Sequence, residues 1–116
     1  MSDDLTFAFE RLQRAAVGLP EVEAGEWYST PALKVRGKGF ARVKDADTVV
    51  VMVALDEKEM LLEAAPDLYF ETPHYSGWPA MLVRIRFISD EELAHRLRAA
   101  WLQKAPKRLA ASLSAG

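Results

Sequence analysis

The sequence predicts an α+β fold, with a single antiparallel sheet of about five or six strands and the N- and C-terminal helices packed on one face. Two observations support this prediction. Apolar residues recur at helical spacing near both ends of the chain, and short strand-like segments fill the region between them. The connections between these segments are short, which favours antiparallel pairing over parallel crossovers.

The two terminal helices are predicted over residues 4–17 and from Ser89 to Pro106. Gly18 follows the first helix, and Ser89 with Glu92 forms a capping box at the start of the last one. The residues after Pro106 are expected to add only a marginal turn and a frayed end. The stripes that should face the core are Leu5, Phe9, Leu12, Ala16 and Leu19 in the first helix and Leu93, Leu97, Ala100 and Trp101 in the last.

The stretch "ALKVRGKGFARV" predicts a β-hairpin. Leu33 and Val35 alternate with basic residues, the glycines supply the turn, and a return strand covers residues 39–43. The sequence does not decide which residues of the return strand point inward, because Phe40 and Val43 fall on opposite faces of a regular strand. The turn lacks P-loop spacing and joins two strands, so a phosphate-binding loop is not predicted there.

A β-branched run at residues 48–55 predicts a central strand, and Asp56 with Glu59 predicts a capping box for a short helix that ends near residue 65. A short strand at residues 67–71 follows. The last strand is predicted over residues 81–87. Its inward positions are Met81, Val83, Ile85 and Phe87.

The composition limits the classes of function. The 116 residues, half of them hydrophobic, are expected to form a single domain over residues 1–116. Cysteine is absent, which excludes disulfides and thiolate metal sites. The first residues lack a basic segment followed by an apolar one, and no apolar run is long enough to span a membrane, so we expect a cytoplasmic protein with no membrane partner.

The net charge of −2 gives no general case for nucleic-acid binding. The charge is nevertheless uneven: residues 27–44 contain five basic and no acidic residues, and residues 72–116 contain seven basic and three acidic ones. Folding could bring these two segments together. Basic residues at the end of the last helix, namely Lys104, Lys107 and Arg108, are explained sufficiently by the helix dipole.

The loop "TPHYSGWP" at residues 72–79 is the strongest candidate for a recognition element. Two prolines restrict its backbone, and it collects three ring side chains just before a strand with two arginines. Rings that stack on bases, next to cations that contact phosphates, are typical of nucleic-acid binding. The predicted binding residues, on the loop, the hairpin and the sheet face away from the helices, are Lys34, Arg36, Lys38, His74, Tyr75, Trp78, Arg84 and Arg86.

Three segments together resemble the MmcQ/YjbR family: "TPALKVRGKGFARV", "TPHYSGWPAMLVRI" and "EELAHRLRAAWLQKAPKRL". The resemblance covers residues 9–109, and the order and spacing of the motifs carry it. Membership implies a CyaY-like α/β fold. It also implies DNA as the partner, because members of the family are commonly labelled DNA-binding.

Several alternatives remain open. His74 could be a structural residue of a tight loop, a ligand contact or a general base. Tyr75 and Trp78 could form an apolar lid without a ligand, and alternation places only one of Trp27 and Tyr28 in the core. No complete catalytic constellation is visible, so we expect a non-catalytic protein, monomeric, without cofactor or metal. A small-molecule or protein-interaction module that uses the same loop is the alternative to DNA binding.

Overall fold

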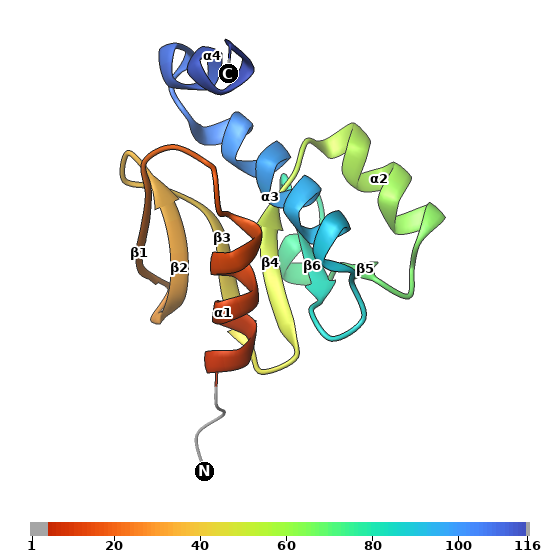
Figure 1. Ribbon diagram of the computed structural model, residues 1–116. Coiled ribbons are helices and arrows are strands. Elements are labelled where there is room, and N and C mark those ends of the chain that lie inside the picture. The colour runs from red at the N-terminus through yellow and green to blue at the C-terminus, as the bar shows by residue number, and fades with distance from the viewer. Residues whose placement is uncertain (1–4, 116) are drawn as a thin grey trace.

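The computed structural model describes residues 5–115, which form a six-stranded antiparallel sheet with helices across one face (Figure 1). This confirms the predicted fold class. The strands are β1 (Val22–Trp27), β2 (Thr30–Val35), β3 (Lys38–Asp45), β4 (Thr48–Met52), β5 (Tyr69–Phe70) and β6 (Ala80–Arg84), in the spatial order β1-β2-β3-β4-β6-β5. The helices are α1 (Thr6–Ala15), α2 (Leu55–Ala64), the short 3₁₀ helix η1 (Pro73–Tyr75), α3 (Asp90–Lys104) and α4 (Lys107–Ala115).

Helices α1 and α3 lie side by side across the same face of the sheet (Figure 1). The predicted stripe of α3 is confirmed, because its four apolar residues are all fully buried. In α1, Leu12 and Ala16 are buried as predicted, and Ala8 joins them. The predicted first position of this helix, residue 4, lies outside the described residues. Burial of these two stripes against the sheet forms the main hydrophobic core.

The sheet confirms the inward positions Leu33 and Val35, and a bulge resolves the ambiguity of the return strand. Leu33 pairs with Ala41 but the next residue pairs with Gly39, so Phe40 is an extra residue in β3. Phe40, Ala41 and Val43 are consequently all buried. Arg42 lies between Ala41 and Val43, and Lys44 follows Val43, so alternation directs these two side chains to the face without α1 and α3.

Two predicted boundaries were wrong for identifiable reasons. Strand β6 ends at Arg84, because the backbone amides of Phe87 and Ile88 turn back to its carbonyl oxygen instead of continuing the sheet ladder. Ile85 is buried as predicted, but Phe87 is 73% exposed. The C-terminal segment is a nine-residue helix rather than a marginal turn, because its apolar residues pack against the core.

The predicted capping box of α2 is also absent. This helix starts at Leu55 with Ala54 as its N-cap, and no side chain caps it. Within residues 5–115, the Asp56 carboxylate accepts a hydrogen bond only from the adjacent amide of Glu57. The Glu57 carboxylate instead pairs with buried Arg96 of α3, which ties α2 to the helix layer.

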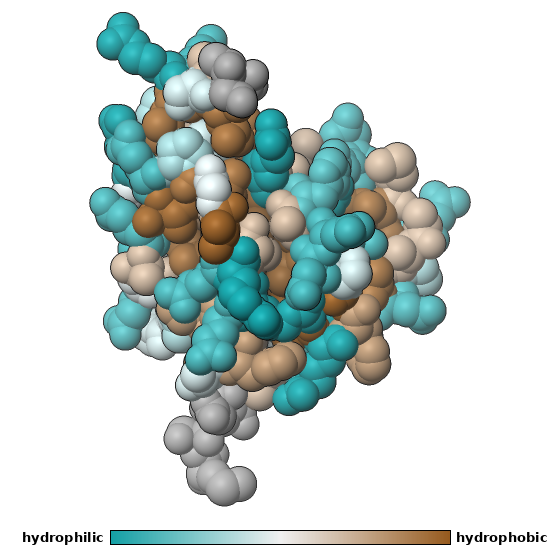
Figure 2. All heavy atoms as spheres, in the orientation of Figure 1, coloured by the Kyte–Doolittle hydropathy of each residue, from teal (hydrophilic) through white to brown (hydrophobic). Residues whose placement is uncertain are grey.

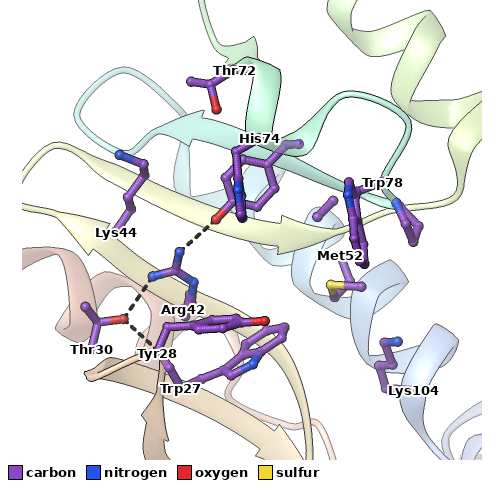
Figure 3. A pocket seen from close by; sticks show the side chains of 13 residues that line it. Trp27, Tyr28, Thr30, Arg42, Lys44, Met52, Thr72, His74, Trp78 and Lys104 are labelled. Carbon is purple, nitrogen blue, oxygen red and sulfur yellow. Dashed lines mark hydrogen bonds between the residues drawn. The ribbon is translucent and has the colours of Figure 1, made fainter.

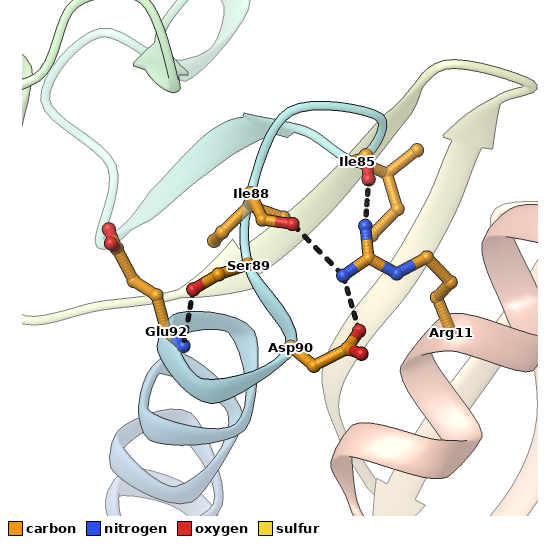
Figure 4. A network of polar contacts seen from close by, with 6 residues as sticks. All are labelled: Arg11, Ile85, Ile88, Ser89, Asp90 and Glu92. Carbon is orange, nitrogen blue, oxygen red and sulfur yellow. Dashed lines mark hydrogen bonds and ion pairs between the residues drawn. The ribbon is translucent and has the colours of Figure 1, made fainter.

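Arg11 interrupts the apolar stripe of α1 and is buried nonetheless (Figure 4). Its guanidinium donates to the carbonyl oxygens of Ile85 and Ile88, the latter at 2.9 Å, and pairs with Asp90 at 2.6 Å. The buried charge is therefore paired and hydrogen-bonded, as burial requires. It fastens α1 to the turn between β6 and α3.

The surface of the helix-bearing face is mostly polar over α1 and α3, whereas apolar side chains gather between α4 and the end of α1 (Figure 2). Leu109, Ala110 and Leu113 of α4 pack against the core from this side. Among the described residues, no helix is long and apolar enough to cross a membrane.

The start of α3 forms half of the predicted capping box. The Ser89 hydroxyl accepts a hydrogen bond of 3.1 Å from the Glu92 amide. The Glu92 carboxylate does not complete the box, because it accepts a hydrogen bond from the hydroxyl of Tyr69 on β5. Burial and this neighbouring carboxylate raise the pKa of the Tyr69 phenol well above its ordinary value.

We expect the Tyr69–Glu92 contact to give the protein a specific alkaline sensitivity. The pKa of Tyr69 is higher in the folded than in the unfolded state, so the stabilisation is complete below the unfolded value of about 10 and is lost as the pH rises toward the folded value. Tyr69→Phe should cost about 1 kcal/mol at pH 7. Urea unfolding at rising pH should show this difference shrinking above about pH 10; a constant difference would contradict the assignment.

Candidate functional site

A cleft of about 870 Å³ lies on the sheet face opposite α1 and α3 (Figure 3). Its lining combines aromatic rings with basic side chains, and no carboxylate of the described residues takes part. The lining residues are Trp27, Tyr28, Thr30, Arg42, Lys44, Met52, Thr72, His74, Tyr75, Trp78, Pro79, Ala80 and Lys104.

The floor of the cleft is apolar. Val50, Ala80 and Leu82 form a second, smaller buried cluster on this face, and Met52 and Tyr75 pack against it. The ring-rich loop therefore covers part of this sheet face, since Tyr75 packs on the cluster. Met52 and Ala80 line the cleft between its two aromatic walls and offer an apolar surface to a planar ligand.

One wall of the cleft is the loop at residues 72–79, which Lys58 of α2 holds in place. The Lys58 side chain is almost completely buried, and its ammonium donates to the carbonyl oxygens of Tyr75 at 2.7 Å and Trp78 at 2.9 Å. It also pairs with Glu71 at 2.8 Å. All three ammonium hydrogens thus have acceptors. Gly77 adopts a φ of +80°, which lets the chain turn between the two anchored carbonyls.

The fixed loop presents its rings in different ways. Trp78 is 64% exposed at the cleft, whereas Tyr75 is half-buried against the floor. His74 is exposed and meets the Tyr75 ring edge-on, with 4.9 Å between the ring centroids. An exposed tryptophan on a fixed backbone offers a stacking surface at a small entropic cost.

The opposite wall is the turn between β1 and β2. Tyr28 and Ser29 both have positive φ values, of 55° and 65°, so the alternation of the strand breaks there. The prediction that one of Trp27 and Tyr28 enters the core was wrong: the two rings stack on each other at 5.7 Å and both line the cleft. Trp27 also covers Gly39, where an added Cβ would lie 2.6 Å from the indole ring.

Arg42 of β3 connects the two walls. Its guanidinium donates to the Thr30 hydroxyl at 3.2 Å and to the Tyr75 hydroxyl at 2.7 Å, and it lies 5.3 Å from the centre of the Tyr28 ring (Figure 3). A further contact of 3.4 Å reaches the Val43 carbonyl oxygen. All these acceptors are neutral, so the positive charge of Arg42 is held in position and no described residue neutralises it.

Two lysines complete the charge of the cleft. Lys44 lies where the pairing of β3 with β4 shifts register, and Lys104 is the last residue of α3. Figure 3 shows them toward opposite ends of the cleft, with Arg42 and the rings between them. The cleft can therefore attract anionic groups at its ends and an aromatic group in its middle.

Of the residues predicted from the sequence, only His74, Tyr75 and Trp78 line this cleft. Lys34 lies on the same sheet face but near Gly25, and Lys38 is exposed at the start of β3. Neither belongs to the lining.

The three predicted arginines also lie elsewhere. Arg84 lies over the Phe70 ring at 4.3 Å. Arg36 and Arg86 are in turns rather than on strands, and each has a carboxylate partner, Glu21 and Asp47 respectively. The Arg36 guanidinium holds the pKa of Glu21 below its ordinary value. None of the three arginines belongs to the lining of the cleft.

The sequence reasoning missed the cations that do line the cleft. Alternation with buried Ala41 and Val43 would have identified Arg42 and Lys44, but the bulge at Phe40 concealed this pattern. Lys104 had a sufficient explanation in the helix dipole, and no local signal connects it to β3. In the described part of the chain, no group of three or more histidine, aspartate or glutamate side chains is placed to hold a metal ion.

Comparison with known proteins extends this description. A family model named YjbR matches residues 17–103. The chain belongs to the YjbR family. The matched range includes β1 to β6 and most of α3, so it contains every residue of the cleft except Lys104. The resemblance seen in the sequence motifs is confirmed.

The chain is also similar to individual proteins. The uncharacterized proteins Mb2600 of Mycobacterium bovis and Rv2570 of Mycobacterium tuberculosis are each 44% identical to it over 52 residues, which cover 45% of this chain and only 40% of either relative. The crystal structure of the Deinococcus radiodurans protein DR2400, with a DUF419 domain, aligns with a TM-score of 0.70 at 18% identity, over 89% of this chain and 85% of that one. This likeness supports the fold of the YjbR domain.

The anchoring role of Lys58 predicts a specific stability effect. Lys58→Met should lower the free energy of unfolding by about 2–4 kcal/mol, because two loop carbonyls and a half-buried carboxylate lose their donor. Urea denaturation measures this loss. The matched control is Glu59→Met on the exposed side of the same helix, which should change stability by no more than about 0.5 kcal/mol. Equal effects of the two substitutions would contradict the role of Lys58.

Proposed function

We propose that this YjbR-family protein is a non-catalytic DNA-binding protein that takes single-stranded DNA into the cleft. One observation carries the proposal: five aromatic rings and three cations line one concave surface, and among the described residues no carboxylate lines it or pairs with these cations. Neither rings nor cations alone would favour nucleic acid, but their combination matches the two chemical parts of a nucleotide.

The rings favour single strands over duplexes. Stacking on an aromatic side chain requires an exposed base face, which a duplex hides within its own stack. Trp78 is held with most of its ring in solvent, and the stacked Trp27 and Tyr28 lie on the other wall. A base that enters between these walls would meet the apolar floor at Met52 and Ala80.

The cations provide the affinity for the sugar–phosphate chain. Lys44 and Lys104 lie toward the two ends of the cleft, and there they would contact the phosphates on either side of a bound base. We propose no catalytic step, because His74 is the only imidazole that lines the cleft and no carboxylate of the described residues lines it to orient the ring.

Titration of a short thymidine strand at low salt tests the proposal, with tryptophan fluorescence as the readout. Binding should be tighter than to a duplex of the same length. If Lys44 and Lys104 each contact a phosphate, the logarithm of affinity should fall with the logarithm of salt at a slope of about −1.4. No binding tighter than about 100 μM at roughly 50 mM salt would overturn the proposal.

A pair of double variants locates the binding surface. Lys44→Ala with Lys104→Ala should weaken binding about tenfold or more and flatten the salt slope. Lys38→Ala with Arg98→Ala removes the same number of charges from exposed positions outside the cleft and should change affinity by less than about threefold. Equal losses in both variants would indicate general charge attraction rather than the cleft.

A second candidate function is supported by the size of the cleft. A volume of about 870 Å³ lies within the range of sites for small organic ligands. A free aromatic molecule with an anionic group would use the same rings and cations. Thermal-shift measurements with mononucleotides and other aromatic anions separate the two candidates, because stabilisation by such a molecule without binding of the DNA strand would favour the small ligand.

A further inference from the structure

Resting on the proposed function, we propose that a bound DNA strand leaves the cleft past Lys44 and reaches a second binding site, where Arg84 contacts a further phosphate. The lining of the cleft places a cation toward each of its ends, Lys44 and Lys104. A strand longer than the cleft must continue over the surface beyond one of these ends. Beyond Lys44 of β3, the sheet continues through β4, β6 and β5.

The pairing of the strands places Arg84 at the same end of the sheet as Lys44. Arg84 of β6 is opposite Thr48 of β4, and Thr48 is opposite Asp45 of β3, which directly follows Lys44. Neighbouring strands lie about 4.8 Å apart, so roughly 10 Å of sheet separates β6 from β3. A strand that passes Lys44 in the direction of β6 would therefore reach Arg84 soon after it leaves the cleft.

Arg84 also projects from the same face of the sheet as the cleft. Leu82, two positions earlier on β6, belongs to the buried cluster under the cleft, together with Val50 and Ala80. Side chains two positions apart on a strand share a face, so Arg84 points away from α1 and α3. Phe70 of β5 is opposite Leu82 and packs against the same cluster. Arg84 and Phe70 thus continue the surface that forms the floor of the cleft.

The charge of Arg84 is not cancelled by a described residue. Its side chain is exposed, and within residues 5–115 it forms no ion pair, although five other basic residues do. Two carboxylates nearby in the sequence are occupied, because Asp47 pairs with Arg86 and Glu71 with a buried lysine. Asp45 accepts the amide of Asp47 at 2.9 Å in the β3–β4 turn and keeps its charge. This charge limits the path of a DNA strand on the side of the turn.

Phe70 holds the guanidinium of Arg84 in place. The guanidinium carbon lies 4.3 Å from the centre of the Phe70 ring, which is a cation–π contact. The ring is itself fixed, because it is half-buried against the apolar cluster. A cation–π contact restrains an arginine without neutralising it, so the group keeps its affinity for the planar oxygen pairs of a phosphate. Phe70 is therefore a positioning residue, and Arg84 is the binding residue.

The salt dependence of binding gives the first test, with a thymidine strand of about 12 nucleotides and tryptophan fluorescence as the readout. A third phosphate contact should steepen the slope from about −1.4 to about −2.1. Arg84→Gln should weaken binding about 3- to 10-fold and return the slope to about −1.4. The matched control Arg98→Gln removes the same charge from an exposed position on α3 and should weaken binding by less than about twofold.

Three outcomes of this test count against the proposals. Wild-type affinity of Arg84→Gln overturns the second site and leaves the proposed function intact. Equal losses in Arg84→Gln and Arg98→Gln also overturn the second site, because they indicate general charge attraction. Absence of binding of the thymidine strand to the wild-type protein overturns both proposals.

Neutralised phosphates distinguish a direct contact of Arg84 from an indirect effect. A strand of abasic sites with one central thymine fixes the position of the DNA, because only this base can stack. Each phosphate in turn is replaced by an uncharged methylphosphonate. At one phosphate, farther from the thymine than the phosphate at which Lys44→Gln becomes insensitive, the replacement should weaken the wild type about 3- to 10-fold and leave Arg84→Gln unchanged.

Phe70→Leu keeps an apolar side chain on the cluster but removes the ring, so it should reduce this coupling at least about twofold. Undiminished coupling would overturn the role of Phe70. Equal sensitivity of Arg84→Gln and the wild type at every phosphate would overturn the second site, even where their affinities differ.

Discussion

The candidate site depends on the buried ammonium of Lys58. A buried charge is tolerated only when it is fully paired and hydrogen-bonded, and here the acceptors are two carbonyls of the ring-rich loop and the Glu71 carboxylate. The loop can therefore hold few conformations other than the one that surrounds this ammonium. Because the backbone of Trp78 is fixed from behind, its ring can stand in solvent without packing against the core. Order in this loop comes from α2, and the opposite side of the loop remains available for a ligand.

Strand irregularities place the remaining parts of the cleft. The extra residue Phe40 lets consecutive apolar residues of β3 enter the core. Gly39, next to it, lacks the side chain that would displace the Trp27 ring. A second register shift occurs at Lys44, where the strand approaches the end of the cleft. Bulges commonly adjust side-chain direction near functional sites, and both irregularities of this sheet lie in the strand that carries Arg42.

These features explain how much the sequence could predict. Strong local periodicity identified the α3 stripe, the alternation of Leu33 and Val35, and the antiparallel sheet, because each follows from a repeating pattern of burial. The ring-rich loop was also recognisable, since its composition is unusual over a few residues. The cleft as a whole was not recognisable from the sequence, because its two walls belong to segments more than 40 positions apart. The direction of the β3 side chains that line it also depends on a bulge. Lys58 gave no signal at all: an isolated lysine on a short helix is ordinarily solvated.

The basic residues of this protein divide by their partners rather than by their place in the sequence. Within the described residues, ion pairs occupy Arg11, Arg36, Lys58, Arg86 and Arg96. Two of these, Arg36 and Arg86, were predicted from the sequence to be free to bind a ligand, because the number of charges in each segment does not show which charges form pairs. Arg42, by contrast, is held by hydroxyl and carbonyl oxygens, which orient a guanidinium but do not cancel its charge. A protein with a net charge of −2 can in this way keep a local site for anions. The neutral partners of Arg42 are therefore as important to the site as the cation itself, because a carboxylate in the place of the Tyr75 hydroxyl would hold the same geometry and remove the attraction.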